Sequence, residues 1–285
     1  MKLFSYKNRP VHLGSYPLER LARQGEIPDL AAVPPMQPVS FIDERNPQSL
    51  TNAMTRYIGM FDVVRDGAVT PLSAEIPADP RERSEHLKAA GYYYDATMVG
   101  IAAMPAEANL ATPIRNPTMP VLVAELEQGQ PKTFAAGIDV IYADVLEAAR
   151  KTLGPVNEHT HALVFLVEYT RDPHADELGT DWFADTQAQR AGLLAANTAI
   201  LLSSYIRLLG YQARAHTVTS SDVDLNKLAV AAGLARVNAQ GNAIENPYVG
   251  SRFGLAAVTT TLTLESDLPL APPHIADRLR SHGPA

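Results

Sequence analysis

Histidines and acids gather around an apolar segment in the middle of the chain. Glu158, His159 and His161 stand at its start, and His174 and Asp176 follow it. A His-x-His pair at the start of a strand places two imidazoles on one face, an arrangement that metal sites use. Because the spacing matches no known zinc motif, we favour a solvated strand edge over a metal site.

Two further groups could carry acid–base chemistry. Asp222 and Asp224 could act as a carboxylate pair, but they lie beside an expected helix start, where a capping role explains them better. The consecutive phenols Tyr92, Tyr93 and Tyr94 include a potential proton donor, although packing is the commoner role of such side chains. Neither group predicts a catalytic residue.

Several chemistries are excluded by what the sequence lacks. The chain has no cysteine, so it can form no disulfide, no cysteine-ligated zinc site, no iron–sulfur cluster and no cysteine nucleophile. It contains no Gly-x-Gly-x-x-Gly or Gly-x-x-x-x-Gly-Lys loop for nucleotide phosphates and no Gly-x-Ser-x-Gly nucleophile elbow.

Composition is that of a globular protein. Hydrophobic residues make up 46% of the 285 positions and charged residues 19%, with a net charge of −7. The basic residues are scattered, which argues against a nucleic-acid partner. The most apolar run, 191–209, contains Asn197, Thr198 and Arg207, so we expect no membrane span, and without a recognisable leader we expect a cytoplasmic location.

Domain organisation follows from proline content and periodicity. Residues 1–50 are rich in proline and predict an extended arm wrapping a globular body, with a disordered leader as the alternative. Residues 51–272 form the expected domain, and 273–285 a polar tail. The expected helices are 51–66, 80–91, 144–153, 186–209 and 225–232; the expected strands are 97–104, 121–126, 162–169 and 253–264; 133–142 fits either.

The expected helix 186–209 is the clearest element. Small residues along it, among them Ala191, Gly192 and Ala195, allow close approach by another backbone or by a flat ligand. We favour tight packing against the body of the domain, because alanine and glycine stripes more often serve that purpose.

An ordered set of motifs follows this helix. It runs through Tyr-Ile-Arg-Leu-Leu-Gly-Tyr-Gln-Ala at 205–213, Leu-Ala-Val-Ala-Ala-Gly-Leu at 228–234, Asn-Pro-Tyr-Val-Gly-Ser-Arg-Phe at 246–253, Val-Thr-Thr at 258–260 and Leu-Pro-Leu at 268–270. Together with a helix-then-strand segment at 86–102, this order resembles the corrinoid-binding domain of cobalamin-dependent reductive dehalogenases, and more distantly that of epoxyqueuosine reductases.

The resemblance implies an α+β fold, a nitroreductase-like mixed sheet flanked by helices. It implies an oxidoreductase that reduces carbon–halogen bonds of halogenated aromatic compounds with base-off cobalamin, supplied with electrons by two iron–sulfur clusters on a cysteine-rich segment. Carried onto this chain, the corrinoid-contacting positions are Tyr205, His216, Asn238, Asn246, Tyr248 and Arg252.

The sequence departs from the family pattern where catalysis would occur. The family's Ala-Gly-Leu-Gly-Glu reads Ala-Gly-Leu-Ala-Arg at 232–236, and the basic residue expected after it is missing. A cation beside the leaving halide would stabilise developing negative charge, so its loss removes a catalytic contribution. The expected proton-donating tyrosine has no counterpart, because 180–186 contains Trp182 and Phe183 but no tyrosine.

We therefore interpret the chain as the non-catalytic N-terminal module of a cytoplasmic, catabolic-type member, packing against a catalytic half that carries corrinoid and clusters. The resemblance implies cobalamin as a possible cofactor of this chain, and this interpretation takes its binding to have been lost. One alternative is a stand-alone corrinoid-binding protein served by a separate ferredoxin-like electron donor. Another is a flavin-dependent nitroreductase-like protein. The resemblance leaves homodimerisation open.

Overall fold

The computed structural model describes residues 21–37, 45–128, 145–151, 153–169, 171, 173–183 and 186–272. Its helices are η2 (Leu30–Ala32), α1 (Leu50–Val63), α2 (Pro80–Tyr93), η3 (Ala106–Ala108), α3 (Met119–Gln128), α5 (Thr180–Phe183), α6 (Gln187–Leu208) and α7 (Leu225–Ala231). Its strands are β1 (Met98–Ala103), β2 (Asn109–Ile114), β3 (His161–Glu168), β4 (Ala213–His216), β5 (Ser221–Val223), β6 (Arg236–Val237), β7 (Ile244–Glu245) and β8 (Phe253–Thr260). The fold class is α+β, as predicted.

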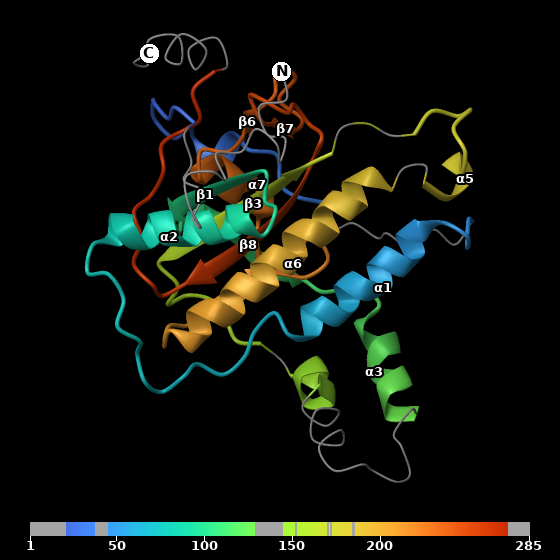
Figure 1. The fold of residues 1–285 in the computed structure, drawn as a ribbon, viewed down its shortest axis with the longest axis horizontal. Helices are drawn as coiled ribbons and strands as arrows, with labels where there is room; N and C mark the ends of the chain where they lie inside the picture. The colour runs from blue at the N-terminus through green and yellow to red at the C-terminus, as the bar shows by residue number, and fades with distance from the viewer. Residues whose placement is uncertain are drawn as a thin grey trace.

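The central sheet has the strand order β1-β3-β8-β4. Every pairing in it is antiparallel, so the expectation of a mixed sheet is wrong for the described strands. β3 and β4 do run in the same direction, joined by the crossover helix α6, but β8 lies between them and pairs with both (Figure 1). The link from β3 through α6 to β4 is thus the crossover connection typical of parallel strands, although β3 and β4 are not hydrogen-bonded to each other.

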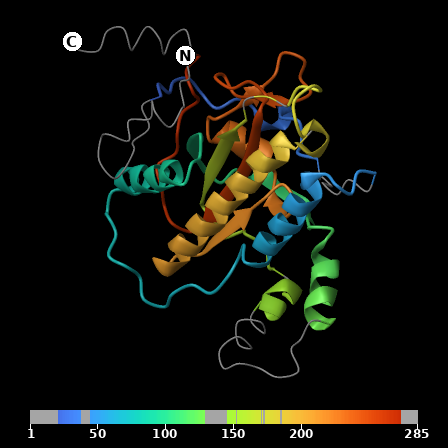
Figure 2. The same ribbon diagram turned by 45° about the vertical axis from the view of Figure 1, so that its right-hand side comes forward.

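Alternation along β3 divides the core into two layers. Leu163, Phe165 and Val167 point to the face that α2 and α6 cover, whereas Val164 and Leu166 point to the face that α7 covers. This is the two-residue period of a strand buried on both sides. Figures 1 and 2 show α6 lying diagonally across the sheet, with α1 beside it as an outer helix.

Tight packing of α6 on the sheet confirms the prediction for its small residues. A Cβ added at Gly254 of β8 would lie 2.3 Å from the backbone nitrogen of Gly192, so the helix and strand backbones are in direct contact. α6 is also long and apolar enough to pass a length-and-composition criterion for a membrane span, but 56% of that window is buried inside the protein, as in a core helix.

The segment 119–128 contradicts its prediction. Residues 121–126 were expected to form a strand, whereas they belong to helix α3. Pro120 is compatible with the first turn of a helix, since the proline nitrogen needs no hydrogen there, and the apolar run that suggested a strand occupies the rest of the helix. Residues 145–150 are helical as expected, and 133–142 lie outside the described residues.

The N-terminal stretch contacts the body of the domain where it is described. The Ala271 amide donates to the Ala22 carbonyl at 2.8 Å, the Met36 amide donates to Asp224 at 3.1 Å, and Val33 is buried in the layer under α7. Residues 1–20 and 38–44 of the expected arm, and the tail 273–285, lie outside the described residues.

Candidate functional site

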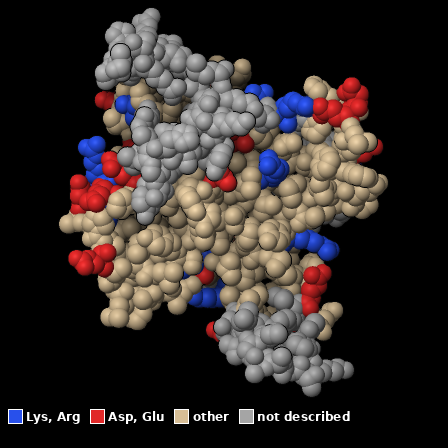
Figure 3. Space-filling model, viewed as in Figure 1, with Lys and Arg blue, Asp and Glu red and all other residues tan. Residues whose placement is uncertain are grey.

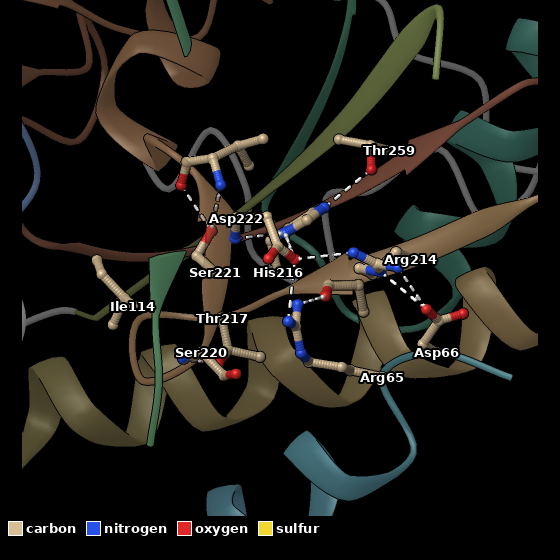
Figure 4. A network of polar contacts seen from close by, with 12 residues as sticks. Arg65, Asp66, Ile114, Arg214, His216, Thr217, Ser220, Ser221, Asp222 and Thr259 are labelled. Atoms are coloured by element: carbon tan, nitrogen blue, oxygen red, sulfur yellow. Dashed lines mark hydrogen bonds and ion pairs between the residues drawn. The ribbon is translucent and has the colours of Figure 1, made fainter. Parts of the chain in front are cut away.

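A buried ionic network occupies the β4 edge of the sheet, on the face opposite α6. β4 carries the alternating sequence Ala-Arg-Ala-His, so Arg214 and His216 point to the same side while both alanines pack under α6. Figure 4 shows how the end of α1, β4 and β5 bring Arg65, Arg214, His216 and Asp222 together.

Asp222 is the centre of this network. Arg65 lies 2.9 Å from its carboxylate, Arg115 3.1 Å and Arg214 3.3 Å. Burial raises the pKa of Asp222, but the charges of Arg65, Arg214 and Arg115 outweigh burial, and the pKa is lowered to about 2. The carboxylate therefore stays ionised and pairs with guanidinium groups from three separate segments of the chain.

His216 is held in one neutral tautomer. Its Nδ1 accepts a hydrogen bond from the Asp222 amide, so the proton sits on Nε2, which donates to Thr259 at 2.8 Å. Burial lowers the pKa of His216 well below its ordinary value, and the charge of Arg65 lowers it further. A fully buried imidazole with both nitrogens engaged supports the structure and has no free atom for a ligand.

Asp62 forms a second polar cluster beside the first. Its carboxyl accepts hydrogen bonds from Asn116 and Thr217 at 2.8 Å and from Thr219 at 2.6 Å. Burial raises the pKa of Asp62, against the effect of these donors. Sequence reasoning missed both clusters, and the alternation at 213–216 was the one local signal that could have indicated the first.

The six residues assigned to corrinoid contact do not meet at one place. Asn246 is 2% exposed and its amide is fully used: Nδ2 donates to the Leu234 carbonyl at 2.6 Å, and Oδ1 accepts from the amides of Tyr248 and Val249. Asn238 bonds to Asn242 and closes the β6–β7 hairpin. These asparagines hold their own loop in shape.

The remaining positions lie on different elements. Tyr248, in the same loop as Asn246, is half-buried against the layer under α7, and Arg252 is exposed just before β8. Tyr205 is 47% exposed in the last turn of α6. None of the six lines the cleft beside Arg23 and Lys88 or the cleft beside Asp62 and Arg115. The side-chain polar atoms of His216 and Asn246 are engaged within the protein.

The histidines and acids at 158–161 and 174–176 do not form one cluster in the structure. His159 hydrogen-bonds Thr259 at 2.6 Å and His161 hydrogen-bonds Thr160 at 2.9 Å, while His174 lies in the turn that contains Glu177. Among the described residues, no three histidine or acidic side chains are arranged to hold a metal ion.

Of the carboxylate pair, Asp224 caps α7 as predicted, accepting from the amides of Asn226 and Lys227. The capping role predicted for Asp222 is wrong, because its carboxylate forms ion pairs with Arg65 and Arg214.

The three consecutive phenols differ in burial. Tyr92 is buried and its hydroxyl oxygen accepts a hydrogen bond from the Val99 amide, whereas Tyr93 and Tyr94 are exposed.

Comparison with known proteins places this fold. No protein-family model and no curated protein matches the chain. A solved structure of the catabolic reductive dehalogenase NpRdhA matches 95% of the chain at 34% identity, with a TM-score of 0.64. The chain is related to the cobalamin-dependent reductive dehalogenases. A second structure, reported as suggesting a mechanism for B12-dependent dehalogenation, and a complex of NpRdhA with 3-bromo-4-hydroxybenzoic acid match equally, each with a TM-score of 0.65.

The matched region is one part of a larger protein. The chain covers 32% of the length of these reductive dehalogenases. The epoxyqueuosine reductase from Bacillus subtilis matches 67% of the chain at 12% identity with a TM-score of 0.39, which adds nothing to the assignment.

Proposed function

We propose that this chain is a non-catalytic, N-terminal type module of a reductive dehalogenase. The module would pack against a catalytic half that holds corrinoid and iron–sulfur clusters and acts on halogenated aromatic compounds. One observation carries the proposal: the side chains at two of the corrinoid-contact positions are already engaged. The polar atoms of His216 and Asn246 form hydrogen bonds within the protein, so they are not available to a corrinoid. The absence of cysteine leaves the chain no cluster of its own.

The outer surface of α1 and α6 supports a docking role. Over the 14 residues of α1 and the 22 of α6, the exposed charged side chains are Arg56 and Arg190 alone. In Figure 3 the face that bears these helices is largely uncharged, and charges gather towards its rim. Its exposed apolar side chains are Leu50, Tyr57 and Met60 of α1, Val64 directly after α1, and Leu194, Leu201, Tyr205 and Leu208 of α6.

Such a surface favours a protein partner. Interface cores are depleted of charge and enriched in tyrosine and methionine, whereas the surface of a free monomer rarely keeps a wide apolar area. The partner that we propose is the remaining part of a reductive dehalogenase, and the match to 32% of such a longer chain supports this choice. A nitroreductase-like architecture is part of the same proposal, supported by the long crossover helix α6 on the central sheet. The proposal also includes the cytoplasmic location expected from the sequence.

Partner binding tests the docking proposal. The chain would be mixed with the corrinoid- and cluster-bearing reductive dehalogenase polypeptide from the same source, and the affinity measured by calorimetry. Leu201→Lys places a charge in the centre of the α1/α6 face and should weaken binding roughly tenfold or more. Leu268→Lys, at a side chain 52% exposed beside the Gly233 turn after α7, is the matched control and should bind normally. Equal affinities for both variants would reject this face as the docking site.

A further inference from the structure

A cleft of about 970 Å³ lies next to the ionic network, and neither the fold nor the proposed docking explains it. It is bounded by the end of α1, the start of α3 and the helical segment 145–150, which lie close together in the lower part of Figure 1. Cavities that take small organic molecules commonly measure about 300 to 1,000 Å³. The volume therefore suits a small molecule.

The lining combines apolar walls with a polar floor. Val63, Met119, Pro120, Val123 and Leu153 supply aliphatic surface. The floor contains Asp62, Arg65, Asn116 and Ser220, each of them buried, and Arg115, Arg150, Lys151 and Glu147 stand at more open positions. Mostly apolar walls with a few convergent polar groups are typical of sites for organic ligands.

The lining of this cleft has four cationic side chains against three acidic ones, although the whole chain carries −7. Asp66 is engaged by Arg214 at 2.7 Å, and both carboxylate oxygens of Asp62 accept hydrogen bonds, from Asn116, Thr217 and Thr219. Glu147 is the acid of the lining that stands at an exposed position. A ligand therefore meets a small excess of positive charge in this cleft.

Two cations keep donors for a ligand. Arg115 is 47% exposed and makes its contacts with Asp222 and the Ile114 carbonyl through Nη1 alone, so within the described residues Nη2 and Nε have no partner. Lys151 is exposed and forms no ion pair with another described residue. Arg150, by contrast, is paired with Glu127.

We propose that this cleft binds a small organic carboxylate, with the carboxylate on Arg115 and Lys151 and the apolar body against the walls formed by α3, residues 148–151 and Leu153. The planar guanidinium fork of arginine matches a carboxylate through two parallel hydrogen bonds, which an ammonium cannot offer. The aliphatic walls favour an acid with an apolar body over inorganic phosphate. This inference is independent of the proposed function, because the side chains that would hold the carboxylate, Arg115 and Lys151, are not part of the proposed docking face.

Ligand-observed NMR with benzoate as the probe tests this site. Benzamide, an uncharged molecule of the same shape, and inorganic phosphate, an anion without an apolar body, are the comparison probes. We expect benzoate to bind more tightly than either, and its affinity to fall as salt is raised. Equal binding of benzamide and benzoate would overturn the proposal, as would preferential binding of phosphate.

Variants locate the binding. Arg115→Gln should weaken benzoate binding roughly 10- to 100-fold, and Lys151→Gln roughly two- to fivefold. Arg81→Gln, at an exposed arginine of α2 in the other cleft, is the control and should leave the affinity unchanged. Because Arg115 also contacts Asp222, circular dichroism must show that its variant is folded; if it is not, Lys151→Gln and the benzamide comparison decide. Unchanged affinity in Lys151→Gln and in folded Arg115→Gln would contradict the assignment.

Discussion

The two edges of the central sheet are buried in different ways. Around β1 and β3, aliphatic and aromatic side chains cover both faces, and Leu163, Val164 and Phe165 are completely buried. At β4 the α6 face is also apolar, but the opposite face is covered by arginines, aspartates and a neutral histidine. The first region is stabilised by loss of apolar surface from water, whereas the second depends on every charge having its partner.

This difference teaches where substitutions should matter most. A core of apolar side chains loses stability in proportion to the volume removed. A buried ionic network loses more when one member is neutralised, because the remaining charges stay buried without compensation. The following predictions order the two regions by expected effect on the free energy of unfolding.

Asp222→Asn should have the largest effect. It removes the charge that compensates Arg65, whose side chain is 2% exposed, and should lower the free energy of unfolding by about 3–5 kcal/mol. Urea denaturation followed by circular dichroism measures it. A loss below about 1 kcal/mol would mean that water reaches these guanidinium groups and that the network is not buried in solution.

Leu163→Ala tests the apolar region. Leu163 is 0% exposed on the face under α6, and its truncation should cost about 3 kcal/mol. The same urea experiment gives the value, and its ratio to the Asp222→Asn value compares the two regions directly. If Leu163→Ala proved much the more damaging of the two, the ranking proposed here would be reversed.

Acidification should weaken the ionic region in the range set by His216. Because burial lowers the pKa of His216 below 6.5, the unfolded chain takes up a proton on this side chain while the folded chain does not. Stability is therefore full above pH 6.5 and falls as the pH drops below it, by up to about 1.4 kcal/mol per unit for each such group.

His216→Asn isolates this contribution. The variant should be less stable at pH 7, since the bond to Thr259 changes, but its stability should fall less between pH 7 and 5.5 than that of the parent chain. Burial also lowers the pKa of His159 and His161, so part of the pH dependence remains. The carboxylate of Asp222, with a pKa of about 2, acts only at lower pH. An unaltered pH slope in the variant would show that His216 titrates normally.

Glu85→Gln should have the smallest effect. It breaks an exposed pair with Arg81 on α2, one helical turn apart, and should cost about 0.3–0.5 kcal/mol, lost at high salt. Denaturation at two salt concentrations measures it. A loss comparable to that of Asp222→Asn would show that exposure does not separate the two kinds of ion pair.

Elements with a sustained period could be predicted from the sequence, and elements defined by distant partners could not. The helices around 51–66, 80–91, 186–209 and 225–232 and the strands around 97–104, 162–169 and 253–264 are present, with ends shifted by a few residues. The alternation of β4 covers only four residues, β5 is too short to show a period, and the apolar run in α3 fits a strand as well as a helix.

The candidate site was less predictable for the same reason. Asp222 lies 157 positions from Arg65 and 107 from Arg115 in the sequence. The residues next to each of them give no signal that these three side chains form ion pairs. The motif at 246–253 gave residue types that could contact a corrinoid, but only the structure shows that the Asn246 amide is spent on its own loop.

The most direct measurement is equilibrium dialysis of the purified chain against cob(II)alamin, with the visible spectrum recorded on the retained protein. If the side chains at the corrinoid-contact positions only stabilise the protein's own structure, the chain should retain no cobalamin at micromolar protein concentration. The visible spectrum of cobalamin should then also stay unchanged. Retention of one equivalent with a base-off spectrum would contradict the account, because it would require a corrinoid site where the structure shows engaged or scattered side chains.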